Sequence, residues 1–304
     1  MRRIVKAVAI LILLVAAAAP ALAADDWRAA FPVLRIGFVV SSSPTEDLSR
    51  LEPFRAYLAA RIGIPVELVP STDGAALIDA ETSGRVAYAI DSAVGYVSAA
   101  AECDCVEPLA EPAAADGARG YYALLLARAD GAIHDLPSAK DARLALTASD
   151  SVAGRLLPMK ALTTAGIDPA TYFSAIYESA GPEDAVAALL DGRVDIAAGW
   201  SSLAGNPATG YSFGVLTRMV ADGRLSMDGV RVVWQSPLIP FAPHTVRKDI
   251  PPELRKLLLD ALLAMATAAP DVLDAVDRTP YGGGGFVAAS PDDYAPLAGL
   301  VAPL

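Results

Sequence analysis

Short apolar runs alternate with amphipathic segments along most of the chain, and this alternation limits the possible folds more than any other feature. Residues 34–40 have the apolar pattern of a buried strand, and residues 47–62 carry apolar side chains at helical spacing. Further strand patterns at 66–69 and 86–90 flank a short Ala-rich helical segment near 75–82. A strand–helix–strand alternation of this kind predicts a mostly parallel sheet covered by helices.

A second unit with the same alternation follows a long apolar stretch at 121–127. Its expected strands are 143–147, 176–178, 194–198 and 230–234, and the expected helices are 153–165, 183–190 and, after a return segment, 254–268. Two such units with a return segment predict two lobes joined by two crossing strands. Ligands bind at the carboxyl ends of strands in sheets of this type, so the cleft between the lobes is the expected site.

The first residues are typical of a secretory signal peptide. Arg2, Arg3 and Lys6 precede an apolar run at 7–19, and Pro20-Ala21-Leu22-Ala23 ends in an A-x-A-like cleavage site. The apolar run is short for a bilayer span. Cleavage near Ala23 would leave 21 basic against 35 acidic residues, a net charge of −14. We therefore expect an exported protein in the periplasm, an oxidising compartment.

The composition excludes several classes of function. An excess of 35 acidic over 24 basic residues is incompatible with a basic nucleic-acid footprint, so we expect no nucleic-acid partner. The sequence lacks Gly-x-Ser-x-Gly, His-Glu-x-x-His and P-loop motifs, and it contains only 2 histidines. We therefore expect no enzymatic activity, no cofactor and no dedicated metal site. The glycine run at 282–285 lacks the context of a phosphate loop and predicts a flexible turn.

Several short motifs occur in an order and spacing that resemble a known family. They are Leu34-Arg35-Ile36-Gly37, Gly63-Ile64-Pro65-Val66, Gly84-Arg85-Val86, Gly120-Tyr121-Tyr122, Leu157-Pro158, Ala165-Gly166-Ile167-Asp168, Asp191-Gly192-Arg193-Val194-Asp195 and residues 232–240 (VVWQSPLIP). In this arrangement the chain resembles the periplasmic phosphonate-binding proteins, which serve ABC transporters of phosphate, phosphite and phosphonate.

The resemblance implies an α/β fold of the two-lobed periplasmic-binding-protein type (type II), with mixed, mostly parallel sheets flanked by helices. The implied domains are a signal peptide at 1–23, a discontinuous first lobe at 32–121 and 241–304, and a second lobe at 122–240. Hinges near Tyr121 and at 237–243 would let this clamshell close on its ligand. The implied partners are a small solute and an ABC permease, and we expect a monomer.

The ligand residues of the family are only partly present. The family binds its oxyanion with a Ser-Thr-Ser-Gly run that opens a helix, and the matching residues here are Ser151, Val152, Ala153 and Gly154. The tyrosine that follows the first lobe persists as Tyr121. Four other family residues are replaced: Gly74 stands for a second tyrosine, Pro182 for a histidine, Ser202 for an acidic residue, and Phe241-Ala242 for the segment that holds an aspartate. Each unmade hydrogen bond to a buried oxyanion costs about 1–3 kcal/mol, so we expect weak phosphonate binding and a less polar ligand.

Cys103 and Cys105 flank Asp104. On an extended chain their side chains project to one face, so two thiols could bind a soft, thiophilic centre. A Cys-x-Cys here resembles a branch of the family that senses arsenite for membrane histidine kinases. The same residues also allow a local disulfide or burial of one cysteine as a small apolar side chain.

Two hypotheses follow. In the first, the protein binds arsenite or a similar neutral metalloid species through Cys103 and Cys105 and signals to a membrane sensor kinase. In the second, it is the binding component of an ABC importer, and the ligand is held by Tyr121 and by the backbone of residues 151–154. Outside these residues, we expect His134 at the surface. For His244, Tyr96 and Trp200, two alternatives stay open: contact with the cleft or ordinary packing.

Overall fold

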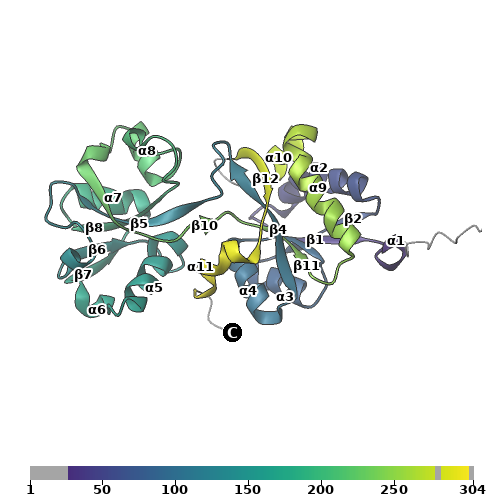
Figure 1. Ribbon diagram of the computed structural model, residues 1–304, viewed down its shortest axis with the longest axis horizontal. Coiled ribbons are helices and arrows are strands. Elements are labelled where there is room, and N and C mark those ends of the chain that lie inside the picture. The colour runs from purple at the N-terminus through teal and green to yellow at the C-terminus, as the bar shows by residue number, and fades with distance from the viewer. Residues whose placement is uncertain (1–26, 278–281, 301–304) are drawn as a thin grey trace, which may run out of the picture.

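The computed structural model describes residues 27–277 and 282–300, so the expected signal peptide lies outside the described residues. Two sheets lie at opposite ends of the long axis, each with its own helices (Figure 1). The structure thus has the mixed α/β, two-lobed architecture that the sequence predicts. In both sheets, however, antiparallel strand pairs outnumber parallel ones, which corrects the expectation of mostly parallel sheets. Among the described residues, no helix combines the length and the apolar composition needed to span a bilayer.

The sheet of the first lobe has the strand order β12-β4-β11-β3-β1-β2. β1 pairs in parallel with β2 and β3, whereas β11 and β12 run antiparallel to their neighbours. Its strands are β1 (Leu34–Val39), β2 (Val66–Ser71), β3 (Tyr88–Ile90), β4 (Val106–Ala114), β11 (His244–Arg247) and β12 (Gly283–Ala288). Its helices are α1 (Trp27–Ala30), α2 (Pro44–Ile62), α3 (Gly74–Thr82), α4 (Ala93–Cys103), α9 (Pro252–Ala268), α10 (Pro270–Val276) and α11 (Ala295–Ala298).

The sheet of the second lobe has the order β10-β5-β8-β6-β7, with β9 also paired to β5. Its strands are β5 (Gly120–Arg128), β6 (Arg143–Leu146), β7 (Ala175–Glu178), β8 (Ile196–Ser201), β9 (Val230–Gln235) and β10 (Ile239–Pro240). Its helices are α5 (Leu157–Thr164), α6 (Pro169–Tyr172), α7 (Pro182–Leu190) and α8 (Val215–Ala221). The segment Val152–Leu156 is wound as a π-helix and leads directly into α5.

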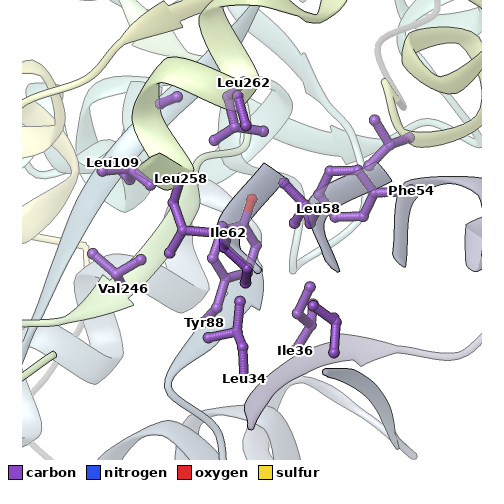
Figure 2. Packing of buried hydrophobic residues seen from close by; sticks show 14 of the residues in the cluster. Leu34, Ile36, Phe54, Leu58, Ile62, Tyr88, Leu109, Val246, Leu258 and Leu262 are labelled. Atoms are coloured by element: carbon purple, nitrogen blue, oxygen red, sulfur yellow. The ribbon is translucent and has the colours of Figure 1, made fainter. Parts of the chain in front are cut away.

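The core of the first lobe lies between the sheet and the helices α2 and α9 (Figure 2). Phe54, Leu58 and Ile62 of α2 are fully buried, as their helical spacing predicts. They pack with Ile36 of β1 and Leu258 of α9. Each large apolar side chain buried in this way stabilises the lobe by about 1.5–3 kcal/mol.

The two connections between the lobes lie side by side. Gly120 and Tyr121 at the start of β5 pair with Pro240 and Ile239 of β10 in antiparallel register. Figure 1 shows β10 between the two sheets. We call these two connections the crossings. Because they are paired to each other, a relative rotation of the lobes has to bend both of them together.

A buried polar network ties both connections to the first lobe. Nε of Arg119, which precedes β5, donates to Oε1 of Glu111 on β4 at 2.6 Å. The hydroxyl of Tyr294 lies 2.8 Å from Oε2 of Glu111 and 2.9 Å from the carbonyl oxygen of Phe241, which follows β10. Burial raises the pKa of Glu111, while Tyr294 and Arg119 favour its charged form. The network therefore holds the first-lobe ends of both crossings.

The glycine run near the carboxyl end corrects one expectation. Gly283–Gly285 belong to β12, which pairs with β4, instead of forming a flexible turn. A Cβ at Gly284 would lie 2.1 Å from the carbonyl oxygen of Ala114, and Gly285 has φ +82° beside an irregularity in the strand register. Glycine is needed here because the two backbones approach too closely for a side chain.

Candidate functional site

A cavity of about 640 Å³ lies between the lobes. Residues from both lobes and from both connections line it, which agrees with the position expected from the fold. The lining residues are Ile90, Asp91, Ser92, Ala93, Val94, Pro112, Tyr121, Thr147, Ser151, Val152, Ala153, Gly154, Pro182, Trp200, Ile239, Pro240, Phe241, Ala242, His244, Val276 and Leu297.

The second lobe presents the start of a helix to this cavity. Ser151 caps the helix, and its Oγ accepts the N–H of Gly154 at 3.1 Å. Val152 and Ala153 follow at the helix start, where backbone N–H groups have no acceptor within the helix. Such N–H groups and the positive end of the helix dipole favour a bound anion.

Thr147 stands at the end of β6 and was not among the residues selected from the sequence. Its side chain is buried, it lines the cavity, and its Oγ1 has no hydrogen-bond partner within the described residues. A Cβ at Gly154 would lie 1.8 Å from this Oγ1, so the hydroxyl lies directly against the helix start. The one available signal is its position after a strand, at the carboxyl edge of the sheet. Thr147 supplies a hydroxyl close to the two that Val152 and Ala153 have lost, which revises the expectation of a stripped oxyanion site.

The first lobe contributes the start of α4. Ser92 caps this helix, and its Oγ accepts the N–H of Gly95 at 2.9 Å. Ala93 and Val94 follow and line the cavity. Asp91, directly before the cap, also lines the cavity. Among the described lining residues it is the one with an acidic side chain, and none of them is Lys or Arg.

His244 lines the cavity but is also part of the packing of the first lobe. Its Nδ1 is hydrogen-bonded to the hydroxyl of Tyr88. The rings of Phe54 and Phe286 lie edge-on to its imidazole, with centroids at 5.7 Å and 4.7 Å. Burial lowers the pKa of His244 to about 3, so the ring is neutral near pH 7.

An aromatic wall completes the cavity near the crossings. The ring of Tyr121 lies 5.3 Å from Trp200 and 6.5 Å from Phe241 between centroids. Burial raises the pKa of Tyr121, which keeps its hydroxyl protonated. Ala242 and Pro182, at positions where the family has polar residues, add apolar surface. Gly74 and Ser202, the other changed positions, are not among the lining residues.

The structure brings together most of the sequence-selected residues: Tyr121, Ser151, Val152, Ala153 and Gly154 all line the cavity. Trp200 joins them, while Tyr96 is buried against Tyr294 with ring centroids 5.1 Å apart. His134 is exposed, as expected.

Cys103 and Cys105 require a correction. They form a disulfide with a Cα–Cα distance of 5.0 Å, and neither lines the cavity. The reason is that α4 begins at the cavity and Cys103 is its last residue, which places the cysteines about 15 Å further along the helix axis. In this form neither sulfur is a thiol, so the thiol-ligand expectation has no support from the geometry.

Two lobes, two paired crossings and a cavity between them define a solute-binding protein of the clamshell type. The family model described as "ABC transporter, phosphonate, periplasmic substrate-binding protein" matches residues 36–294. The chain therefore belongs to the family of periplasmic phosphonate-binding proteins of ABC transporters, which confirms the resemblance found in the sequence.

Solved structures agree with this fold. A binding protein of an ABC phosphonate transporter from Pseudomonas aeruginosa is 24% identical, with a TM-score of 0.51 and coverage of 88% of this chain and 85% of that one. A Xanthomonas citri protein bound to ATP is 21% identical, with a TM-score of 0.60 and coverage of 88% and 95%. A Prochlorococcus marinus protein in complex with methylphosphonate is 15% identical, with a TM-score of 0.51 and coverage of 88% and 97%.

Proposed function

We propose that this protein is the periplasmic binding component of an ABC importer, and that its ligand is a tetrahedral oxyanion with an organic substituent, such as an organophosphonate. In this proposal the chain is exported, its signal peptide is cleaved near Ala23, and the closed form docks on an ABC permease. The observation that carries the ligand class is the helix start at Ser151 with the Thr147 hydroxyl beside it.

Thr147 and the helix start at Ser151 together form what we call the oxyanion corner of the cavity, and its chemistry suits an oxyanion. Thr147 Oγ1 is a buried hydroxyl without a partner within the described residues, and an unmade buried hydrogen bond costs about 1–3 kcal/mol. A ligand oxygen would satisfy it together with the first N–H groups of the helix. The start of α4 offers further backbone donors from the opposite wall.

The rest of the cavity supports an organic substituent on the oxyanion. Its volume of about 640 Å³ lies within the range of about 300–1000 Å³ that is usual for pockets of drug-sized ligands. Trp200, Tyr121 and Phe241 offer flat apolar surface there. The Xanthomonas citri protein, which has a similar fold, is bound to ATP, a much larger molecule than a bare oxyanion.

The arsenite-sensing alternative depends on two free thiols near the ligand. Because the cysteines are paired in a disulfide and lie outside the cavity lining, the geometry supports the importer hypothesis instead.

Titration of the purified mature protein tests the proposal. The probes are phenylphosphonate, methylphosphonate, phosphate, phosphite and arsenite, followed by tryptophan fluorescence and thermal unfolding. We expect phenylphosphonate to bind more tightly than methylphosphonate and to stabilise the protein by about 2.7 kcal/mol at a hundredfold excess over Kd. Arsenite binding without any phosphonate binding would contradict the proposal.

Variants locate the site. Thr147→Val and Ser151→Ala should each weaken phenylphosphonate binding by about tenfold or more, since each removes a hydroxyl from the oxyanion corner. Thr267→Val is the matched control, because Thr267 is exposed on α9 and its hydroxyl bonds only to the carbonyl oxygen of Ala264. Equal affinity in all three variants would place the ligand elsewhere.

A further inference from the structure

Two carboxyl groups are buried together in the first lobe beneath the cavity. Glu81 belongs to α3 and is 1% exposed, and Asp91 follows β3 and is 8% exposed. Asp91 lines the cavity, so this pair borders the ligand site although it takes no part in the oxyanion corner.

Each carboxyl has one oxygen with a protein donor and one without. The Thr245 hydroxyl donates to Oε1 of Glu81 at 2.6 Å, and the N–H of Ser92 donates to Oδ1 of Asp91 at 2.7 Å. Oε2 of Glu81 and Oδ2 of Asp91 are buried, and no donor reaches them from the described residues. The two carboxyls lie close enough together that the charge of Glu81 acts on the pKa of Asp91.

Burial raises the pKa of both groups, and the charge of Glu81 raises that of Asp91 further. Two like charges in contact within a protein interior do not ionise together. The pair therefore holds one shared proton and one negative charge.

The cations on the surrounding elements do not line the cavity. On β11, Arg247 donates to the carbonyl oxygen of Glu81 at 2.7 Å, forms an ion pair with Asp249, and lowers the pKa of Glu81 through its charge. His244 on the same strand is neutral, and α4 contributes the uncharged Ser92. On α3, Asp79 is exposed and paired with Arg85.

We propose that Glu81 and Asp91 act as the charge-selecting group of the cleft, which accepts a singly charged oxyanion and disfavours a doubly charged one. This inference rests on the proposed function. No Lys or Arg lines the described cavity wall, so a second negative charge on the ligand meets the charge of the pair without a side-chain cation to offset it. At the effective dielectric constant of a protein site this repulsion corresponds to a weakening on the order of tenfold.

Two probes of matched shape test the selection at about pH 8.5. Phenylphosphonate is then mostly a dianion, whereas its monomethyl ester remains a monoanion. The wild-type protein should bind the monoester more tightly. In the double variant Glu81→Gln/Asp91→Asn, which removes the charge of the pair, the affinity for the dianion should rise on the order of tenfold relative to that for the monoester.

The single variant tests the shared proton. Asp91→Asn replaces a protonated acid by a neutral amide, so the pair keeps one charge and the ratio of the two affinities should stay at its wild-type value. Tightening of dianion binding already in Asp91→Asn would show two charges in the wild-type pair and overturn the shared proton. Asp79→Asn/Glu67→Gln is the control, because it removes two exposed acidic groups from the same lobe.

The outcomes separate the two proposals. An unchanged ratio in the double variant, with both probes still bound, overturns charge selection and leaves the proposed function intact. If the ratio of the two affinities changes equally in the exposed control, charge selection by the pair is also overturned, because the net charge of the lobe would then explain the change. Failure of both probes to bind the wild-type protein overturns the proposed function, and charge selection with it.

Discussion

The carbonyl oxygen of Ile239 lies 2.1 Å from the point where a Cβ on Gly120 would stand. These residues belong to β10 and β5, the two connections between the lobes, which pair at this position. The absence of a side chain on Gly120 lets the crossings run in contact. The pairing of the two crossings therefore depends on a glycine whose role is close backbone approach.

Gly120→Ala should destabilise the protein by about 1–3 kcal/mol, because the added methyl group forces the two crossings apart. Urea unfolding of the mature protein measures this change. Gly229→Ala is the control, since a Cβ at Gly229 would meet no atom within 4 Å. Equal stability of both variants would show that the crossings can separate freely.

Gly154→Ala should reduce phenylphosphonate affinity by about tenfold or more. The new Cβ would lie 1.8 Å from Thr147 Oγ1 and 2.8 Å from Ser151 Oγ, so both hydroxyls of the oxyanion corner must move. Calorimetric titration gives the affinity. Gly181→Ala serves as the comparison, because Gly181 precedes another helix near the cavity and a methyl group there would meet no atom within 4 Å.

Tyr294→Phe should cost about 1–3 kcal/mol of unfolding free energy, since it removes the hydroxyl that satisfies the buried Oε2 of Glu111. Thermal and urea unfolding both report this loss. Tyr177→Phe makes the same chemical change at a side chain that is 48% exposed. Its free energy of unfolding should stay within about 0.5 kcal/mol of the wild-type value.

His244 should make stability fall on acidification below about pH 6.5. The pKa of its folded form is lowered to about 3 by burial, whereas the unfolded chain takes up a proton near 6.5, so acid favours unfolding between these values. The stability difference between wild type and His244→Gln should change by about 2 kcal/mol between pH 7.5 and pH 5. Glu81 and Asp91, with raised pKa values, act in the opposite direction in both proteins and cancel in the difference.

Reduction of the Cys103–Cys105 disulfide should leave phenylphosphonate affinity unchanged, because neither sulfur lines the cavity. The ring it closes is short, so its loss should lower stability by no more than about 2 kcal/mol. Cys103→Ser/Cys105→Ser should behave like the reduced protein in both assays. An arsenite response of the reduced protein that disappears in this variant would restore the thiol-ligand hypothesis.

Local patterns predicted much of this structure correctly. The helical spacing of Phe54, Leu58 and Ile62 identified the buried face of α2, and the apolar run before Thr147 identified β6. Tyr121 and the helix start at Ser151 were found through their place in family motifs. These features depend on residues close together in the chain, so a single sequence is sufficient to detect them.

Other features depend on partners far apart in the sequence. The glycines at 283–285 form a strand because β4 lies beside them, and Thr147 is recognisable as a site residue only when Gly154 and the cavity are in place. The cysteines are carried away from the ligand by the length of α4.

The sequence by itself determined the alternating pattern of strands and helices, the two-lobed class and the family, since hydrophobic periodicity and motif spacing are local properties of the chain. It did not predict α4, β4 or β11. Only the tertiary structure decided which polar groups face the cavity and which carboxyl groups lie together beneath it. In the proposed charge selection, Glu81 and Asp91 share one proton because folding removes both carboxyls from water and leaves an oxygen of each without a donor from the described residues.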